Sequence, residues 1–145
     1  MPKLEYTNSK GLVQKTGSGG VNINEGRLRQ VLSATDVDAR HNSEVTAAQI
    51  NGGIVVHSST TGAGNVTFTD AANIISGCSL DADGQCIKLY YINDGDQALT
   101  LADSSGGTTT MADTGNTILE NEAAILLIRR TSSSACKVFQ LSKTS

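Results

Sequence analysis

The sequence predicts an all-β protein: a small β-sandwich or barrel, β-tulip-like or jelly-roll-like, with one short helix and an extended N-terminal arm. Three observations lead to this fold class. From residue 45 onward, short apolar or alternating segments recur between turns rich in Gly, Ser and Asp. The 145 residues are enough for one domain, and 38% hydrophobic against 17% charged residues can supply a modest core. The first third is poorer in large apolar residues.

Residues 1–44 are the predicted arm, and residues 45–145 are the predicted β domain. The arm carries six Lys/Arg against five Asp/Glu, a net charge of +1, whereas the domain carries five against nine, a net charge of −4. A segment this poor in apolar surface cannot offset its own ordering entropy. Two interpretations remain open, a disordered tail and an arm that orders on a partner surface. A turn or two of helix over 25–32 would be marginal in isolation.

The β domain is predicted from its local patterns. Residues 65–69 alternate apolar and polar, and Asp70 and Gly77 suit the two ends of a short helix over 70–75. The unbroken apolar run 123–128 indicates a central strand, either covered on both faces or with one face against another subunit. The strands expected are 54–57, 65–69, 86–92, 98–102, 108–112, 117–119, 123–130 and 136–141.

The polar stretch Asn93-Asp94-Gly95-Asp96 is predicted to be a hairpin turn. A three-residue loop would place Tyr91 opposite Leu99 and keep Lys88 away from the leucines. The alternative is a weak calcium site, here or at Asp81-Ala82-Asp83-Gly84, but neither stretch has the ligand spacing of an EF-hand loop.

We expect no catalytic residues, no cofactor and no metal. The sequence has no nucleophile elbow, zinc-protease motif or P-loop, and His41 and His57 are its only histidines. Cys78, Cys86 and Cys136 are interpreted as reduced structural thiols, with a Cys78–Cys86 bridge as the less favoured alternative.

We also expect neither nucleic acid nor membrane as a partner. The net charge is −3, and only five residues are aromatic. No stretch is apolar over the length of a membrane span, and the start MPKLEYTNSK lacks the apolar core of a signal peptide. These features favour assembly in a cytoplasm.

Four stretches carry a family resemblance: MPKLEYTNSKGLVQKTGSGGVNI, VTAAQINGGIVVHSSTTGAG, DAANIISG and ILENEAAILLIRRTSSSACKVFQLS. In texture and order they resemble small structural proteins of tailed, especially marine, bacteriophages, above all capsid decoration (cement) proteins. The resemblance covers nearly the whole chain but includes no diagnostic motif. It implies a homotrimer on the exterior of the virion, assembled in the host cytoplasm. It also implies that the arm reaches onto the major capsid protein and stabilises the shell against genome pressure.

The expected contacts follow from this plan. The trimer interface is expected at Leu126, Leu127 and Arg129, because the run 123–128 has more apolar surface than one sandwich face needs. The alternative function is a head- or tail-fibre knob that binds a host-surface glycan in a polar, aromatic-lined pocket. The capsid contacts of the arm are expected at Leu4, Tyr6, Leu12, Val13, Val21, Ile23, Arg27 and Arg29.

Overall fold

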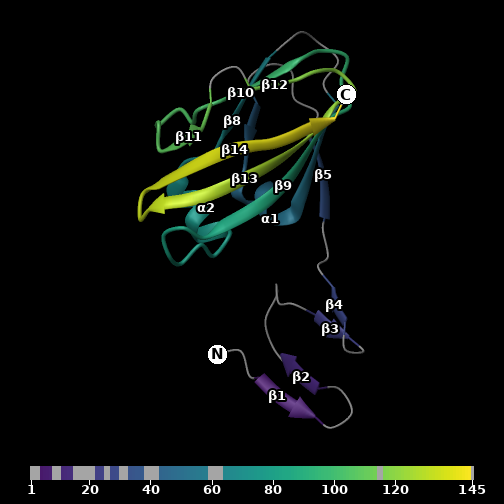
Figure 1. Ribbon diagram of the computed structural model, residues 1–145, viewed down its shortest axis with the longest axis vertical. Coiled ribbons are helices and arrows are strands. Elements are labelled where there is room, and N and C mark those ends of the chain that lie inside the picture. The colour runs from purple at the N-terminus through teal and green to yellow at the C-terminus, as the bar shows by residue number, and fades with distance from the viewer. Residues whose placement is uncertain are drawn as a thin grey trace. The chain divides into compact units, whose positions relative to one another are not determined.

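The computed structural model divides the chain into two compact units, Met1–Leu32 and Ser33–Ser145. It describes residues 4–7, 11–14, 22–24, 27–29, 33–37, 43–58, 64–113 and 116–144. Figure 1 labels most elements of both units.

In the described residues of the N-terminal unit, the strands form two antiparallel pairs. Strand β1 (Leu4–Thr7) pairs with β2 (Gly11–Gln14), and β3 (Asn22–Asn24) pairs with β4 (Arg27–Arg29). The possible helix over 25–32 is therefore wrong where the structure describes it, since Arg27–Arg29 is a strand.

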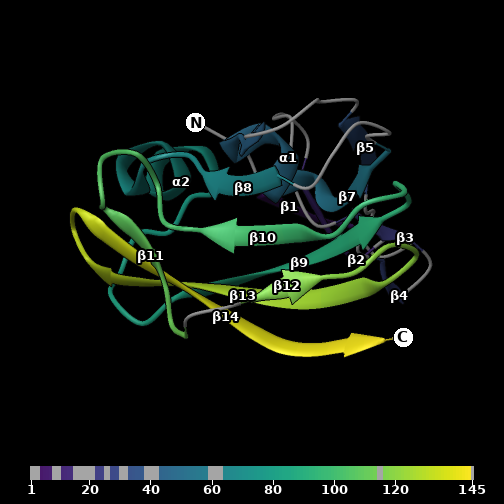
Figure 2. The same cartoon turned by 90° about the horizontal axis from the view of Figure 1, so that it is seen from above.

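The second unit, which we call the body, is a sandwich of two mixed sheets (Figures 1 and 2). From edge to edge, the larger sheet contains β11 (Thr109–Met111), β14 (Ala135–Thr144), β13 (Ala123–Ser132), β9 (Cys86–Asn93), β7 (Gly53–His57) and β5 (Ser33–Val37). The smaller sheet contains β12 (Thr117–Ile118), β10 (Leu99–Ala102), β8 (Gly64–Phe68) and β6 (Ser43–Val45).

The predicted hairpin at 93–96 is wrong. Strand β9 pairs with β13 and β7 in the larger sheet, whereas β10 pairs with β12 and β8 in the smaller one. The stretch is a turn, but it carries the chain from one sheet to the other. The apolar alternation fixes which side of each strand faces the core, and it is equally satisfied when the two strands face each other across the core.

Two short helices accompany the sheets. Helix α2 (Ala71–Gly77) lies where the sequence predicts it, although the Asp70 side chain makes no capping hydrogen bond and instead accepts one from Thr108 Oγ1 at 3.1 Å. Helix α1 (Ala47–Gly52) was not predicted. Its signal is a capping box, in which Thr46 and Gln49 bond reciprocally, followed by Gly53 in the left-handed region at φ 85°.

The core lies between the two sheets and includes residues of both helices. Ile50 of α1 and Ile74 of α2 are fully buried together with Val66 and Phe68 of β8 and Leu89 of β9. In Figure 2, α1, α2 and β8 lie on the same side of β13 and β14. The helices therefore help the smaller sheet to cover the inner side of the larger sheet.

The all-β prediction is confirmed, with one more helix than expected. The parallel pairs β5–β7–β9 and β6–β8–β10 distinguish this sandwich from a jelly roll, which is antiparallel. The structural boundary lies between residues 32 and 33, before the predicted one at 44, because β5 and β6 pair with β7 and β8 of the body. Such nonlocal pairing leaves no local signal in the sequence.

Candidate functional site

Strand β13 has one buried side and one partly exposed side. Ala124, Leu126 and Ile128 point into the core and are at most 3% exposed. Ile125 and Leu127, which alternate with them, are partly exposed on the outside of the larger sheet. The apolar run 123–128 therefore serves the core with every second residue and leaves the others for the outer surface.

Neighbouring strands extend this apolar surface. Ile125 lies opposite Tyr90 of β9, and Leu127 lies opposite Phe139 of β14. Since directly opposed residues share a side of the sheet, their side chains form one continuous surface. We call it the outer face, and its apolar residues are Ile54, Val56, Tyr90, Ile92, Ala123, Ile125, Leu127 and Phe139.

Three cations lie at one end of the outer face. Arg129 is opposite Lys137, and Lys88 is opposite Leu127. The Lys88 ammonium lies 5.9 Å from the centre of the Tyr90 ring, close enough for a cation–π contact. We call Lys88, Arg129 and Lys137 the basic patch. The described outward positions of β9, β13 and β14 include no carboxylate, so on these strands the like charges of Arg129 and Lys137 face each other without a compensating acid.

The next residue, Arg130, has a different role. Its guanidinium donates from Nε to Asp83 Oδ1 at 2.9 Å and to the carbonyl oxygen of Ser132 at 3.1 Å, and from the Nη1 nitrogen to that of Leu80 at 2.6 Å. Arg130 thus fixes the loop before β9, while exposed Arg129 remains available to a partner. Asp83 is accordingly a turn residue held by an ion pair.

The predicted trimer residues divide between the two sides of β13. Leu126 is 0% exposed and belongs to the core of its own subunit, so its side chain cannot meet a neighbour. Leu127 and Arg129 lie on the outer face. The sequence analysis did not identify Lys88, Tyr90 and the other outer-face residues of β9 and β14. For β9, the alternation of residues over 86–92 could have indicated which side chains point outward.

The predicted capsid contacts belong to the N-terminal unit. Their side-chain surroundings, and Val21 entirely, lie outside what the structure describes. Leu4 and Tyr6 are in β1, Leu12 and Val13 in β2, Ile23 in β3, and Arg27 and Arg29 in β4.

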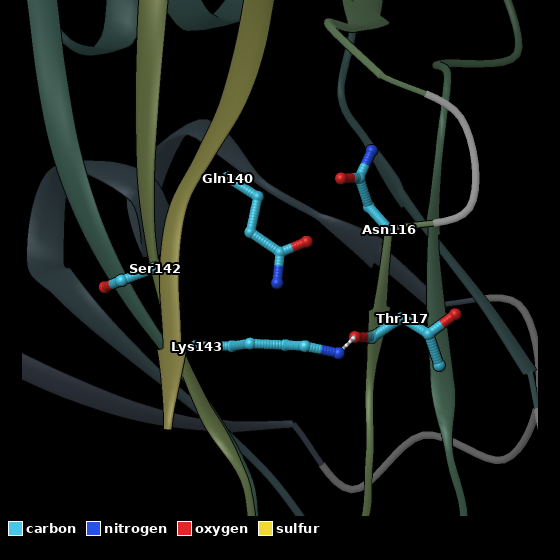
Figure 3. A pocket seen from close by; sticks show the side chains of 5 residues that line it. All are labelled: Asn116, Thr117, Gln140, Ser142 and Lys143. Atoms are coloured by element: carbon cyan, nitrogen blue, oxygen red, sulfur yellow. Dashed lines mark hydrogen bonds between the residues drawn. The ribbon is translucent and has the colours of Figure 1, made fainter. Parts of the chain in front are cut away.

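A polar groove of about 260 Å³ lies between β12 and the C-terminal part of β14 (Figure 3). Gln140 and Lys143 point across it toward β12, and Lys143 Nζ donates to the Thr117 carbonyl oxygen at 3.5 Å. The other lining residues are Asn116 and Ser142, so no described lining residue is aromatic. The groove therefore lacks the stacking surface that the glycan interpretation expects.

The buried His57–Tyr91 pair is a structural contact. His57 Nδ1 lies 2.9 Å from the Tyr91 hydroxyl, and the two residues are at most 2% exposed. Burial raises the pKa of Tyr91 above its ordinary value of 10.0, so the phenol stays protonated well into the alkaline range. Solvent does not reach this pair in the folded chain.

The described residues include neither a disulfide, nor a metal-binding cluster, nor a membrane-spanning helix. Cys78, Cys86 and Cys136 are free thiols, and only Cys86 is exposed, so the bridge between Cys78 and Cys86 is not formed. No group of three His, Cys, Asp or Glu side chains could hold a metal ion within the part of the chain that is described. In that same part, no helix is long and apolar enough to cross a membrane.

Comparison with known proteins adds no relative: no family model, curated protein or solved structure matches this chain.

Proposed function

We propose that this chain is a structural virion protein of a tailed bacteriophage. It is a trimeric decoration (cement) protein that binds the major capsid protein on the outside of the shell and stabilises the shell against the pressure of the packaged genome. The proposal rests on the resemblance described above and on one structural observation, the opposite charge of the two units.

The charge difference increases when the chain is divided at the structural boundary. Residues 1–32 carry five Lys/Arg against two Asp/Glu, a net charge of +3, and residues 33–145 carry six against twelve, a net charge of −6. A division at residue 44 gives only +1 and −4. The basic residues thus concentrate in the unit assigned to docking, where they would attract an acidic shell surface.

Such a protein needs many modest contacts. Each N-terminal unit docks through its strands and its cations, and three linked copies bind more tightly than one because the second and third contacts become intramolecular. A trimer that bridges neighbouring shell subunits opposes their separation.

The test is co-sedimentation with empty shells assembled from the major capsid protein of the same virus. The full chain should bind and raise the temperature at which the shells rupture, whereas the fragment 33–145 should bind far more weakly. Arg27→Glu combined with Arg29→Glu should also weaken binding, with Arg40→Glu, a basic residue outside the N-terminal unit, as the matched control. Full binding by fragment 33–145 would show that the N-terminal unit is not the docking element.

A glycan array tests the alternative. Glycan binding by the full chain, without binding to shells, would replace the decoration function by that of a fibre knob.

A further inference from the structure

The outer face has the composition of a covered sheet face. A sheet with one side in water normally alternates apolar and polar residues, and parallel strands such as β5, β7 and β9 are normally covered on both sides. Here the outward positions of β7, β9 and β13 are occupied by residues such as Ile54, Tyr90 and Ile125. Ile92 is 36% exposed at the edge of this surface. Contiguous apolar surface of this kind marks an interaction site.

The two ends of the outer face differ in charge. β9 and β13 are antiparallel, so the start of β9 and the end of β13 share the end that carries the basic patch. At the opposite end lie the exposed acids Asp94, which directly follows β9, and Glu120, shortly before β13. Lys143, a cation that the structure describes at that end, faces the groove and donates to the Thr117 carbonyl oxygen. In the loop at the basic end, Asp81 is exposed, while Asp83 is engaged by Arg130.

This polarity makes the outer face complementary to a second copy of the same chain. In a face-to-face contact with the two copies in opposite directions, the basic patch of each copy lies over the Asp94 and Glu120 end of the other while the apolar middles meet. The body of the neighbour is acidic overall, at −6. If the two copies ran in the same direction, their two basic patches would face each other and repel.

The size of the outer face also fits a second copy of the chain. The ten residues of β13 extend for about 33 Å, and six strands span about 25 Å, so the rectangle that encloses the face measures about 800 Å² in projection. One partner of a standard protein interface buries about 800 Å². A stable contact must therefore cover nearly the whole face, including both charged ends, so the two copies must run in opposite directions.

We propose that the outer face is the contact between copies of this chain, with Lys88, Arg129 and Lys137 of one copy meeting Asp94 and Glu120 of the other. Because both copies use the same face and the contact covers nearly all of it, the contact closes as a two-fold pair. The inference therefore goes beyond the proposed function, whose trimer would need a second contact elsewhere.

The first experiment measures the mass of the full chain at micromolar concentration by sedimentation, without shells. The chain should form an oligomer, and Leu127→Ser should raise its dissociation constant at least about tenfold, because a central apolar contact is lost. The matched control is Leu119→Ser, which alters a leucine that is 48% exposed but outside the outer face. Circular dichroism verifies that both variants fold.

The second experiment exchanges charges. Arg129→Glu with Lys137→Glu should dissociate the oligomer, and so should Asp94→Lys with Glu120→Lys. The four substitutions in one chain should restore association, since the attraction returns with its sign reversed. Lys143→Glu, on the groove side of β14, should have no effect.

The third measurement uses Cys86, the exposed thiol that lies opposite Arg129 in the sheet. Alkylation of Cys86 should be several-fold slower in the oligomer than in the Leu127→Ser variant. A wild-type chain that stays monomeric overturns the inference, as does an oligomer that neither Leu127→Ser nor the charge reversals disturb.

The outcomes separate this inference from the proposed function. An oligomer formed through the outer face that does not bind shells keeps the interface and overturns the decoration function. A monomer that decorates shells keeps the decoration function and overturns the interface. A dimer held by this face is the result that the inference expects, and it would leave the trimer without a contact on this face.

Discussion

The side-chain amide of Asn93 donates a hydrogen bond to the carbonyl oxygen of Ile118, 3.1 Å away, and thereby connects the larger sheet to the smaller one. The same Nδ2 group also donates to the carbonyl oxygens of Gln97 at 2.8 Å and Leu119 at 2.9 Å. Asn93 Oδ1 accepts from the Gly95 backbone N–H at 3.2 Å. Asn93 is 0% exposed, so one buried side chain bonds three carbonyl oxygens and one backbone N–H where the chain crosses between the sheets.

Asn93→Ala should therefore lower the free energy of unfolding by about 3 kcal/mol, because buried carbonyl oxygens lose their donor. Urea denaturation followed by circular dichroism measures this loss. The control is Asp96→Ala, at an exposed position of the same turn, which should change stability by less than about 0.5 kcal/mol. Equal losses in the two variants would contradict the role assigned to Asn93.

Gly77 should tolerate no side chain, although it ends helix α2 at an exposed position. A Cβ atom at Gly77 would lie 2.7 Å from the Ala47 Cβ atom of helix α1. Gly77→Ala should thus destabilise the body by about 1–3 kcal/mol, whereas Gly→Ala in a helix ordinarily stabilises it.

A double-mutant cycle tests this contact. Ala47→Gly should cost about 1 kcal/mol alone, since glycine is a poor helix former, yet should recover part of the loss when combined with Gly77→Ala. Purely additive effects would show that the two positions do not meet.

The fragment 33–145 should fold alone and unfold cooperatively, because it contains every strand of the two body sheets. A fragment that begins at residue 45 lacks β5 and nearly all of β6, which exposes the edges of β7 and β8. It should be less stable by at least about 2 kcal/mol or aggregate. Thermal unfolding of both fragments measures the difference in stability. Equal unfolding temperatures would show that the body begins near residue 45 and not at residue 33.

Alkaline pH should reduce the contribution of Cys78 to stability. Burial, with a smaller contribution from Cys136, raises the pKa of the Cys78 thiol from 9.0 to about 11. Below pH 9 the thiol is protonated in both states. Between pH 9 and about 11 the unfolded chain loses this proton first, so the unfolding free energy falls as pH rises.

The variant Cys78→Ala isolates this effect. Its stability difference from the wild type should shrink between pH 8 and pH 11 in urea denaturation. Cys86→Ala, at the exposed cysteine, is the matched control. If the stability difference from the wild type shrank equally for both variants, the pH dependence would not come from the buried Cys78 thiol.

Local patterns in the sequence predicted most body elements. The expected strands over 86–92 and 123–130 are the observed Cys86–Asn93 and Ala123–Ser132, and the helix over 70–75 is the observed Ala71–Gly77. These elements could be predicted because alternation, turn residues and helix ends are properties of neighbouring residues. The division of β13 into an inner and an outer side follows from the same alternation.

What only the tertiary structure decided is which elements meet. Strand β5 pairs with β7 in parallel, and β9 and β10 lie in different sheets, although the sequence joins β9 and β10 by a turn that also suits a hairpin. Likewise, Lys88, Arg129 and Lys137 form one patch because β9, β13 and β14 pair in a particular register. The sequence by itself determined the period of each strand and the charge of each segment. Partner and register depend on how nonlocal segments bury their apolar sides together, and that free energy exists only once the strands are assembled.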